Sequence, residues 1–200
     1  MWSGGKDSCL AVWRTARELR IDYLVSMLSD GRSRAHGLSC ELLRRQADCV
    51  GIEIFLVETT WESYEERLKK VFEVLNARRA VFGDIYLEEH RRWIERVCSE
   101  VGVEPIFPLW REDTSKLARE FASMFEAYVV AAKRELAEIL GRKFDFELIE
   151  ELESMGVDPC GENGEFHTLV VDGPLFTKRL DVNFGGVTEN ERYLLLEVKF

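Results

Sequence analysis

Short apolar runs alternate with longer amphipathic segments along most of this chain, and this pattern constrains its fold more than any other feature. Residues 9–20 carry Leu10, Trp13, Ala16 and Leu19 at helical spacing, and residues 23–28 then predict a short buried strand. The alternation continues with expected helices at 39–50, 63–75, 88–101 and 116–125, and with expected strands at 53–57, 79–85, 104–109 and 127–132. Strands and helices in this order imply parallel β–α–β units with right-handed crossovers.

Local signals refine this pattern. Ser63 and Glu66 have the spacing of a capping box, which predicts a helix start there. After Lys133 the rhythm changes to short helical stretches, followed by β-like runs separated by turn dipeptides: helices at 135–140 and 146–155, and strands at 166–171, 175–184 and 192–200. We therefore expect an α/β protein with a parallel sheet flanked by helices in residues 1–133 and a smaller α+β domain in residues 134–200.

Composition and charge exclude several classes of protein. Acidic residues outnumber basic ones by 37 to 27, a net charge of −10, whereas proteins that bind nucleic acid through its phosphates carry a basic face. The five cysteines are scattered without a Cys-x-x-Cys pair, so we expect reduced thiols and no zinc site. No apolar run reaches the roughly 18 residues of a membrane helix, and no signal peptide is visible. We expect a cytoplasmic protein without direct contact to nucleic acid or membrane.

The strongest motif is Ser3-Gly4-Gly5-Lys6-Asp7-Ser8, directly before the first amphipathic helix. Its two glycines leave backbone N–H groups open to an anion, and these groups, the helix N-terminus and the two serine hydroxyls together suit a phosphate. Lys6 adds a positive charge, and Asp7 is a candidate to cap the helix or to bind Mg²⁺. The motif is not a Walker loop, in which Ser or Thr follows Gly-Lys. From the residues alone, a phosphate loop and an ordinary turn before a capped helix are equally good interpretations.

A second motif spans residues 158–168, with the sequence DPCGENGEFHT. Asn163-Gly164 is a strong tight-turn dipeptide, and Glu162 and Glu165 flank it. A solvated hairpin tip with two surface carboxylates is the simpler interpretation. Two glutamates and His167 at a glycine-rich bend also suit an amine, a cation or Mg²⁺, and we keep both interpretations open.

Together these motifs resemble those of a known family. SGGKDS resembles the PP-loop of the N-type ATP pyrophosphatases, which cleave ATP to AMP and pyrophosphate. GENGEFHT with the following VDGPLF resembles the C-terminal signature of the diphthine–ammonia ligase family, and Gly83-Asp84-Ile85, Pro108-Leu109-Trp110 and Leu140-Gly141-Arg142 match it elsewhere. The resemblance covers nearly the whole chain. It implies a HUP-type, Rossmann-like ATP-binding domain and a C-terminal substrate domain.

The resemblance also implies a reaction and its participants. ATP adenylates the carboxylate of diphthine, a modified histidine on elongation factor two, and ammonia then displaces AMP to give an amide. In this reading ATP and Mg²⁺ are the cofactors, residues 3–8 hold the phosphates, Asp7 is a ligand of Mg²⁺, and the catalytic residues are Lys6, Asp7, Glu162, Glu165 and His167. The alternatives are a related ATP pyrophosphatase acting on another carboxylate or carbonyl group, and a nucleotide-binding sensor without turnover. A homodimer is compatible with either reading.

Three further positions belong to the expected ATP site. Met27 ends a predicted strand and His36 lies in the following loop, where such folds bind adenine or phosphate. Gly83 and Asp84 follow the predicted strand at 79–85, at the edge where α/β proteins usually bind ligands. Family members carry a strand before the PP-loop, but here only Met1 and Trp2 precede it. We expect this chain to lack that central strand, as a truncated start would.

Overall fold

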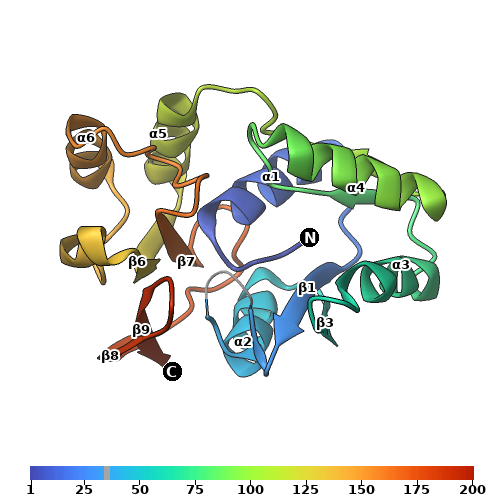
Figure 1. Cartoon of the computed structure of the whole chain (residues 1–200), viewed down its shortest axis with the longest axis horizontal. Helices are drawn as coiled ribbons and strands as arrows, with labels where there is room; N and C mark the ends of the chain where they lie inside the picture. Colours follow the sequence, from blue (N-terminus) through green and yellow to red (C-terminus); the bar gives the residue numbers. More distant parts are fainter. Residues whose placement is uncertain (34–36) are drawn as a thin grey trace.

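The computed structural model describes residues 1–33 and 37–200 of the chain, and Figure 1 shows its elements. The strands are β1 (Leu24–Ser29), β2 (Arg32–Ser33), β3 (Ile54–Glu58), β4 (Arg79–Val81), β5 (Glu104–Ile106), β6 (Glu126–Ala132), β7 (Phe166–Asp172), β8 (Asn183–Glu189) and β9 (Leu194–Lys199). The helices are α1 (Lys6–Ala16), α2 (Cys40–Val50), α3 (Tyr64–Val74), α4 (Glu88–Glu100), α5 (Thr114–Met124), the 3₁₀ helix η1 (Arg134–Ile139) and α6 (Phe146–Ser154). In these residues no helix is long and apolar enough to span a membrane.

The N-terminal half holds two small parallel sheets where a continuous one was expected. β1 pairs in parallel with β3, and β4 pairs in parallel with β5, while the short β2 joins β1 in the antiparallel direction. Between the two sheets the backbone N–H of Trp2 donates to the carbonyl of Val25 at 2.7 Å, and the amino group of Met1 donates to the carbonyl of Val81 at 2.5 Å. Met1 and Trp2 therefore bridge the sheets, beside a cavity of about 430 Å³ between β1 and β4.

The C-terminal half is built on an antiparallel sheet in the order β7-β6-β9-β8. The strand expected at residues 127–132 belongs to this sheet: β6 pairs antiparallel with both β7 and β9. The parallel direction predicted for it is wrong. β6 lies between two partner strands and is largely buried, so its sequence is nearly continuously apolar, and such a run specifies burial but not strand direction.

Three local predictions need correction. Ser63 does not cap α3 with its side chain, because its Oγ instead accepts the N–H of Thr60 at 2.9 Å. Most of the strand expected at 175–184 is irregular, and Thr177 in this segment donates its N–H and its hydroxyl to the carbonyl of Cys49, both at 2.7 Å. The stretch expected as a helix at 135–140 is the 3₁₀ helix η1.

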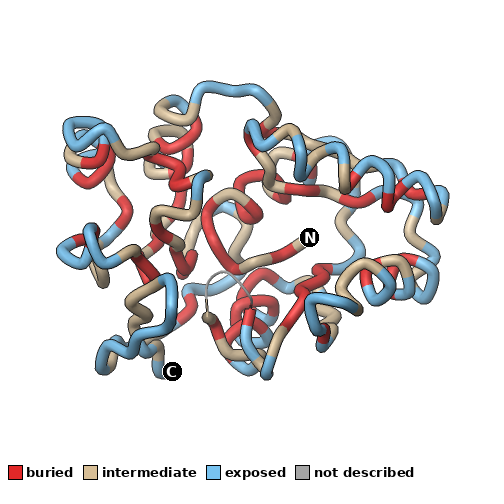
Figure 2. The backbone as a smooth tube through the Cα atoms, in the orientation of Figure 1, coloured by how far each residue is buried: buried red, intermediate tan, exposed pale blue. Residues whose placement is uncertain are grey.

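Helix α1 lies at the centre of the molecule. Its residues Cys9, Leu10, Ala11 and Val12 are all buried, and it packs against β7 of the C-terminal sheet. In Figure 2 most of α1 is coloured as buried residues. The N-terminus of α1, which carries the first motif, is thereby held against the C-terminal half.

Candidate functional site

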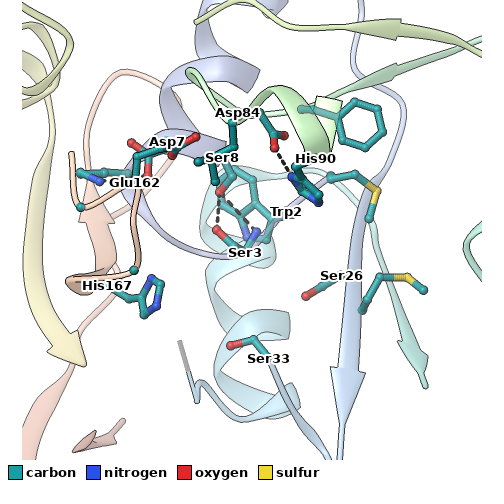
Figure 3. A pocket seen from close by; sticks show the side chains of 18 of the residues that line it. Trp2, Ser3, Asp7, Ser8, Ser26, Ser33, Asp84, His90, Glu162 and His167 are labelled. Carbon is teal, nitrogen blue, oxygen red and sulfur yellow. Dashed lines mark hydrogen bonds and ion pairs between the residues drawn. The ribbon is translucent and has the colours of Figure 1, made fainter. Parts of the chain in front are cut away.

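A pocket of about 360 Å³ opens at the N-terminus of α1 (Figure 3). Residues of β1, β2, α3, the loop after β4, α4 and the segment 160–168 form the rest of its wall. The pocket brings together most of the residues predicted for the site, namely Ser3, Lys6, Asp7, Ser8, Met27, Gly83, Asp84, Glu162 and His167. Gly4, Gly5 and Glu165 do not line it, and His36 lies outside the described residues.

The loop before α1 is ordered by its own serines. Gly5 is the N-cap residue of α1 in an extended conformation, with no side-chain cap. The Oγ atoms of Ser3 and Ser8 lie 3.0 Å apart, and Ser8 Oγ also donates to the carbonyl of Gly5 at 3.0 Å. The N–H of Lys6 donates to Thr168 Oγ1 on β7 at 3.0 Å. The two halves of the chain therefore meet at the first helical N–H group.

The fully buried Gln46 of α2 holds the same loop from below. Its Nε2 donates to the carbonyls of Gly4 at 2.9 Å and Val170 at 2.7 Å, and its Oε1 accepts the indole N–H of Trp2 at 2.8 Å. Gly4 has a φ of +83°, and a Cβ atom there would lie 2.9 Å from Gln46 Oε1. Close packing on α2 and a positive φ thus require glycine at position 4.

Lys6 connects the two motifs. Its buried ammonium group donates to Asp7 Oδ2 at 2.9 Å and to the backbone carbonyl of Cys160 in the second motif. Burial lowers the pKa of Lys6, but the neighbouring acidic groups, with Asp7 foremost, together outweigh this effect and leave the pKa above its ordinary value. A fixed positive charge therefore lies between residues 3–8 and residues 158–168.

The second motif is a turn rather than a hairpin tip, since the element directly before it is the helix α6 and not a strand. The N–H of Gly164 donates to the carbonyl of Gly161 at 2.9 Å, and Asp158 accepts the N–H groups of Cys160 at 3.0 Å and Glu162 at 3.2 Å. Glu162 points into the pocket (Figure 3), where its Oε1 accepts the N–H of Ile85 at 2.9 Å. Burial, reinforced by the nearby carboxylates, raises the pKa of Glu162 to about 7. This carboxyl group is suited to exchange a proton near neutral pH.

The other two predicted residues of this motif differ from Glu162. Glu165 does not line the pocket, and its Oε1 accepts the side-chain N–H of Asn163 at 3.2 Å. His167 lines the pocket, and burial lowers its pKa to about 4. Its ring is therefore neutral at physiological pH and lies against Tyr193, with the ring centroids 5.0 Å apart.

His90 is a pocket residue that the sequence analysis missed. It lies in the first turn of α4, where its Nδ1 is hydrogen-bonded to Asp84 and its ring stacks on Trp93. A lone histidine in an amphipathic helix carries no signal of its own. Its spacing of six residues after the Gly-Asp pair was the only available hint.

Asp7, the residue predicted as a ligand of Mg²⁺, is one of the carboxylates that line this pocket. One of its oxygens is bonded to Lys6, which leaves the other for a cation. Among the described residues no group of three or more potential metal ligands is present. A single carboxylate suits Mg²⁺ when substrate phosphates supply further ligands. The residues present thus fit an Mg²⁺ ion that is bound jointly by a protein carboxylate and the phosphates of a nucleotide.

Comparisons with known proteins identify the family of this chain. Residues 1–105 match the family described as diphthamide synthase N-terminal domain, and residues 113–198 match the diphthamide synthase C-terminal domain. The diphthine–ammonia ligase of Rattus norvegicus is 31% identical, covering 90% of this chain and 80% of that protein. The diphthine–ammonia ligase of Danio rerio is 27% identical, covering 90% and 84%. Because the family matches extend over both halves of the sequence, the chain belongs to the diphthamide synthase family.

Proposed function

We propose that this protein is an ATP-dependent, AMP-forming amide ligase that converts diphthine on elongation factor two to diphthamide. The observation that carries the proposal is the contact of Lys6 with Cys160, because it joins the two motifs in one pocket. Family membership and the names of the relatives support the acceptor.

In the first step the phosphates of ATP lie against residues 3–8. The diphthine carboxylate attacks the α-phosphorus, the bond to the β-phosphate oxygen breaks, and pyrophosphate leaves. Lys6 neutralises charge that develops on the phosphate oxygens, and the serine hydroxyls and helix N-terminus orient them. Asp7 would hold Mg²⁺ together with the phosphates, and the metal would supply further charge neutralisation. Met27, Gly83 and Asp84 form the rest of the proposed nucleotide site. His36, which the sequence predicts for it, lies outside the described residues.

In the second step ammonia attacks the carbonyl carbon of the acyl-adenylate, and AMP leaves. Ammonium must lose a proton before it can attack. Glu162 is the proposed base, since its pKa of about 7 lies between those of an ordinary carboxyl group and ammonium. His167 is neutral in this pocket and is proposed to line the acceptor side with Glu165 behind it. A division into an ATP domain and an acceptor domain is part of the same proposal. The boundary expected at 133 would cut off β6 from its partners β7 and β9, so β6 is assigned to the acceptor domain.

Product analysis tests this function. The protein is incubated with ATP, Mg²⁺, an ammonium salt and elongation factor two that carries diphthine, and the nucleotides are separated by chromatography. We expect AMP in amounts equal to the amide formed, measured by mass spectrometry of the factor. AMP formation only with another carboxylate would favour a related ligase, ATP binding without turnover would favour a sensor, and ADP as the main product would contradict the class.

A further inference from the structure

His90 is fixed on two sides. Its Nδ1 is hydrogen-bonded to Asp84 Oδ1, and its ring lies parallel to that of Trp93, with an interplanar angle of 3° and centroids 5.7 Å apart. Trp93 is itself held, because its indole N–H donates to Glu65 Oε2 at 3.0 Å. The His90 side chain remains 53% exposed and lines the pocket beside Asp84 (Figure 3). An oriented imidazole thus leaves its Nε2 edge accessible to a ligand.

The pocket carries several acidic groups, so a polyanionic ligand would need further positive charge there. Three carboxylates line it, on Asp7, Asp84 and Glu162. Of the Lys6 ammonium protons, two are directed to Asp7 and to the Cys160 carbonyl. Burial lowers the pKa of the Met1 amino group to about 6, so this group is mostly neutral at physiological pH. Among the described residues that line the pocket, Lys6 is therefore a weak counter-charge for a polyanion.

We infer that His90 is a second cationic contact for the phosphates of the bound nucleotide and that Asp84 positions it. This inference rests on the proposed function, since it requires nucleotide phosphates in the pocket. The hydrogen bond to Asp84 outweighs burial and raises the pKa of His90, which favours the imidazolium form. Asp84 directs Nδ1–H to itself, and the remaining N–H, on Nε2, is the donor offered to a phosphate oxygen. The competing role is a ring platform for adenine, formed by His90 with Trp93.

Nucleotide affinities separate the two roles. We would measure the Kd values of ATP, AMP and adenosine by calorimetry, in the presence of Mg²⁺, for the parent protein and for His90→Gln, His90→Lys and Arg92→Gln. Arg92 is the matched control, because it is an exposed cation on the same helix that does not line the pocket. Loss of one charged hydrogen bond should weaken ATP binding by about tenfold or more in His90→Gln.

Adenosine binding should be unchanged in His90→Gln, and His90→Lys should regain most of the affinity for ATP. Equal losses for ATP and adenosine would assign His90 to adenine stacking and overturn the inference. Unchanged ATP affinity in His90→Gln would overturn it as well, while the proposed function would stand. A parent protein that binds no ATP would overturn both. Arg92→Gln should bind all three ligands as the parent does. If this variant lost as much ATP affinity as His90→Gln, the loss would come from removing any nearby positive charge, and the inference would be overturned.

Discussion

The carboxylate of Glu162 accepts a hydrogen bond from the backbone N–H of Ile85 at 2.9 Å, across 77 positions of sequence. This bond joins the turn of the second motif to the Gly83-Asp84 loop. It orients a carboxyl group that burial has brought to a pKa of about 7. The relationship makes Glu162, rather than Glu165, the acidic residue of the turn with access to the pocket.

Replacement of Glu162 by Gln should slow amide formation by about 10²–10⁴-fold, the usual contribution of a general base. ATP affinity should remain within a few-fold of the parent, because the amide keeps the shape and still accepts from Ile85. In the parent, the rate should fall as the pH drops through about 7, since protonated Glu162 cannot accept a proton. Single-turnover rates from pH 5.5 to 8.5 measure this.

Glu165→Gln is the matched control for that experiment. Glu165 belongs to the same turn but does not line the pocket. We expect its rate to stay within a few-fold of the parent. If both glutamine variants formed amide at the parental rate, the turn would have no catalytic part.

Glu162 should also reduce stability at alkaline pH. Its folded pKa of about 7 lies above the ordinary value of 4.5, so the folded protein binds more protons than the unfolded chain between these values. Stability therefore falls as the pH rises from 4.5 to 7. At pH 8, Glu162→Gln should be more stable than the parent by about 1–3 kcal/mol, and at pH 4 the two should be equal. Urea unfolding at both pH values tests this. If the stability difference between Glu162→Gln and the parent were the same at pH 4 and pH 8, the raised pKa of Glu162 would not be the cause.

How much of this site the sequence could predict depends on the range of the interactions. Residues 3–8 were recognisable because the glycines, the lysine and the following helix are neighbours in sequence. The pairing of Glu162 with Ile85 was not, because it depends on how two distant loops pack. His90 was missed for the same reason, since Asp84 and Trp93 define its environment.

The fold shows the same division. Helical periodicity located α1, α2, α4 and α5 to within a few residues, because amphipathic spacing is a local property. The direction of β6 is set by its pairing with β7 and β9. Ser63 does not cap α3 because its hydroxyl is hydrogen-bonded to Thr60 instead. Apolar runs and capping patterns do not encode such competition.

Gln46→Leu should destabilise the protein by about 3 kcal/mol or more, because it removes three hydrogen bonds and leaves buried partners unsatisfied. Trp2→Phe removes the bond to Oε1 and part of a buried ring but keeps the two bonds that Gln46 donates, and it should have a smaller effect. Thermal or urea unfolding measures both. If Gln46→Leu were as stable as the parent, the hydrogen bonds of Gln46 would not contribute to the stability of the loop before α1.

Gly83→Ala should lower stability by about 1–3 kcal/mol through overpacking. A Cβ at Gly83 would lie 2.9 Å from the carbonyl carbon of Asp7 and from the backbone nitrogen of Ser8, so the first turn of α1 would have to move. Gly186→Ala is the control, since a Cβ there meets no atom within 4 Å. The free energies of unfolding of the two variants, measured in urea, should differ clearly. Equal values would show that the backbone around Gly83 can shift to accommodate the methyl group at little cost.

Gly5→Val tests the proposed phosphate loop itself. Gly5 is buried, but its φ of −94° and ψ of 175° are an extended conformation that a branched residue adopts without backbone strain. Circular dichroism of the variant therefore has to establish first that it folds. Position 4 differs, because its φ of +83° and its packing on Gln46 make any side chain there a folding defect. If phosphates approach the backbone at Gly5, the valine side chain blocks them, and ATP binding should be lost in a protein with parental circular dichroism. Calorimetry with ATP decides the matter: a folded Gly5→Val protein that binds ATP as tightly as the parent would remove the phosphates from this loop.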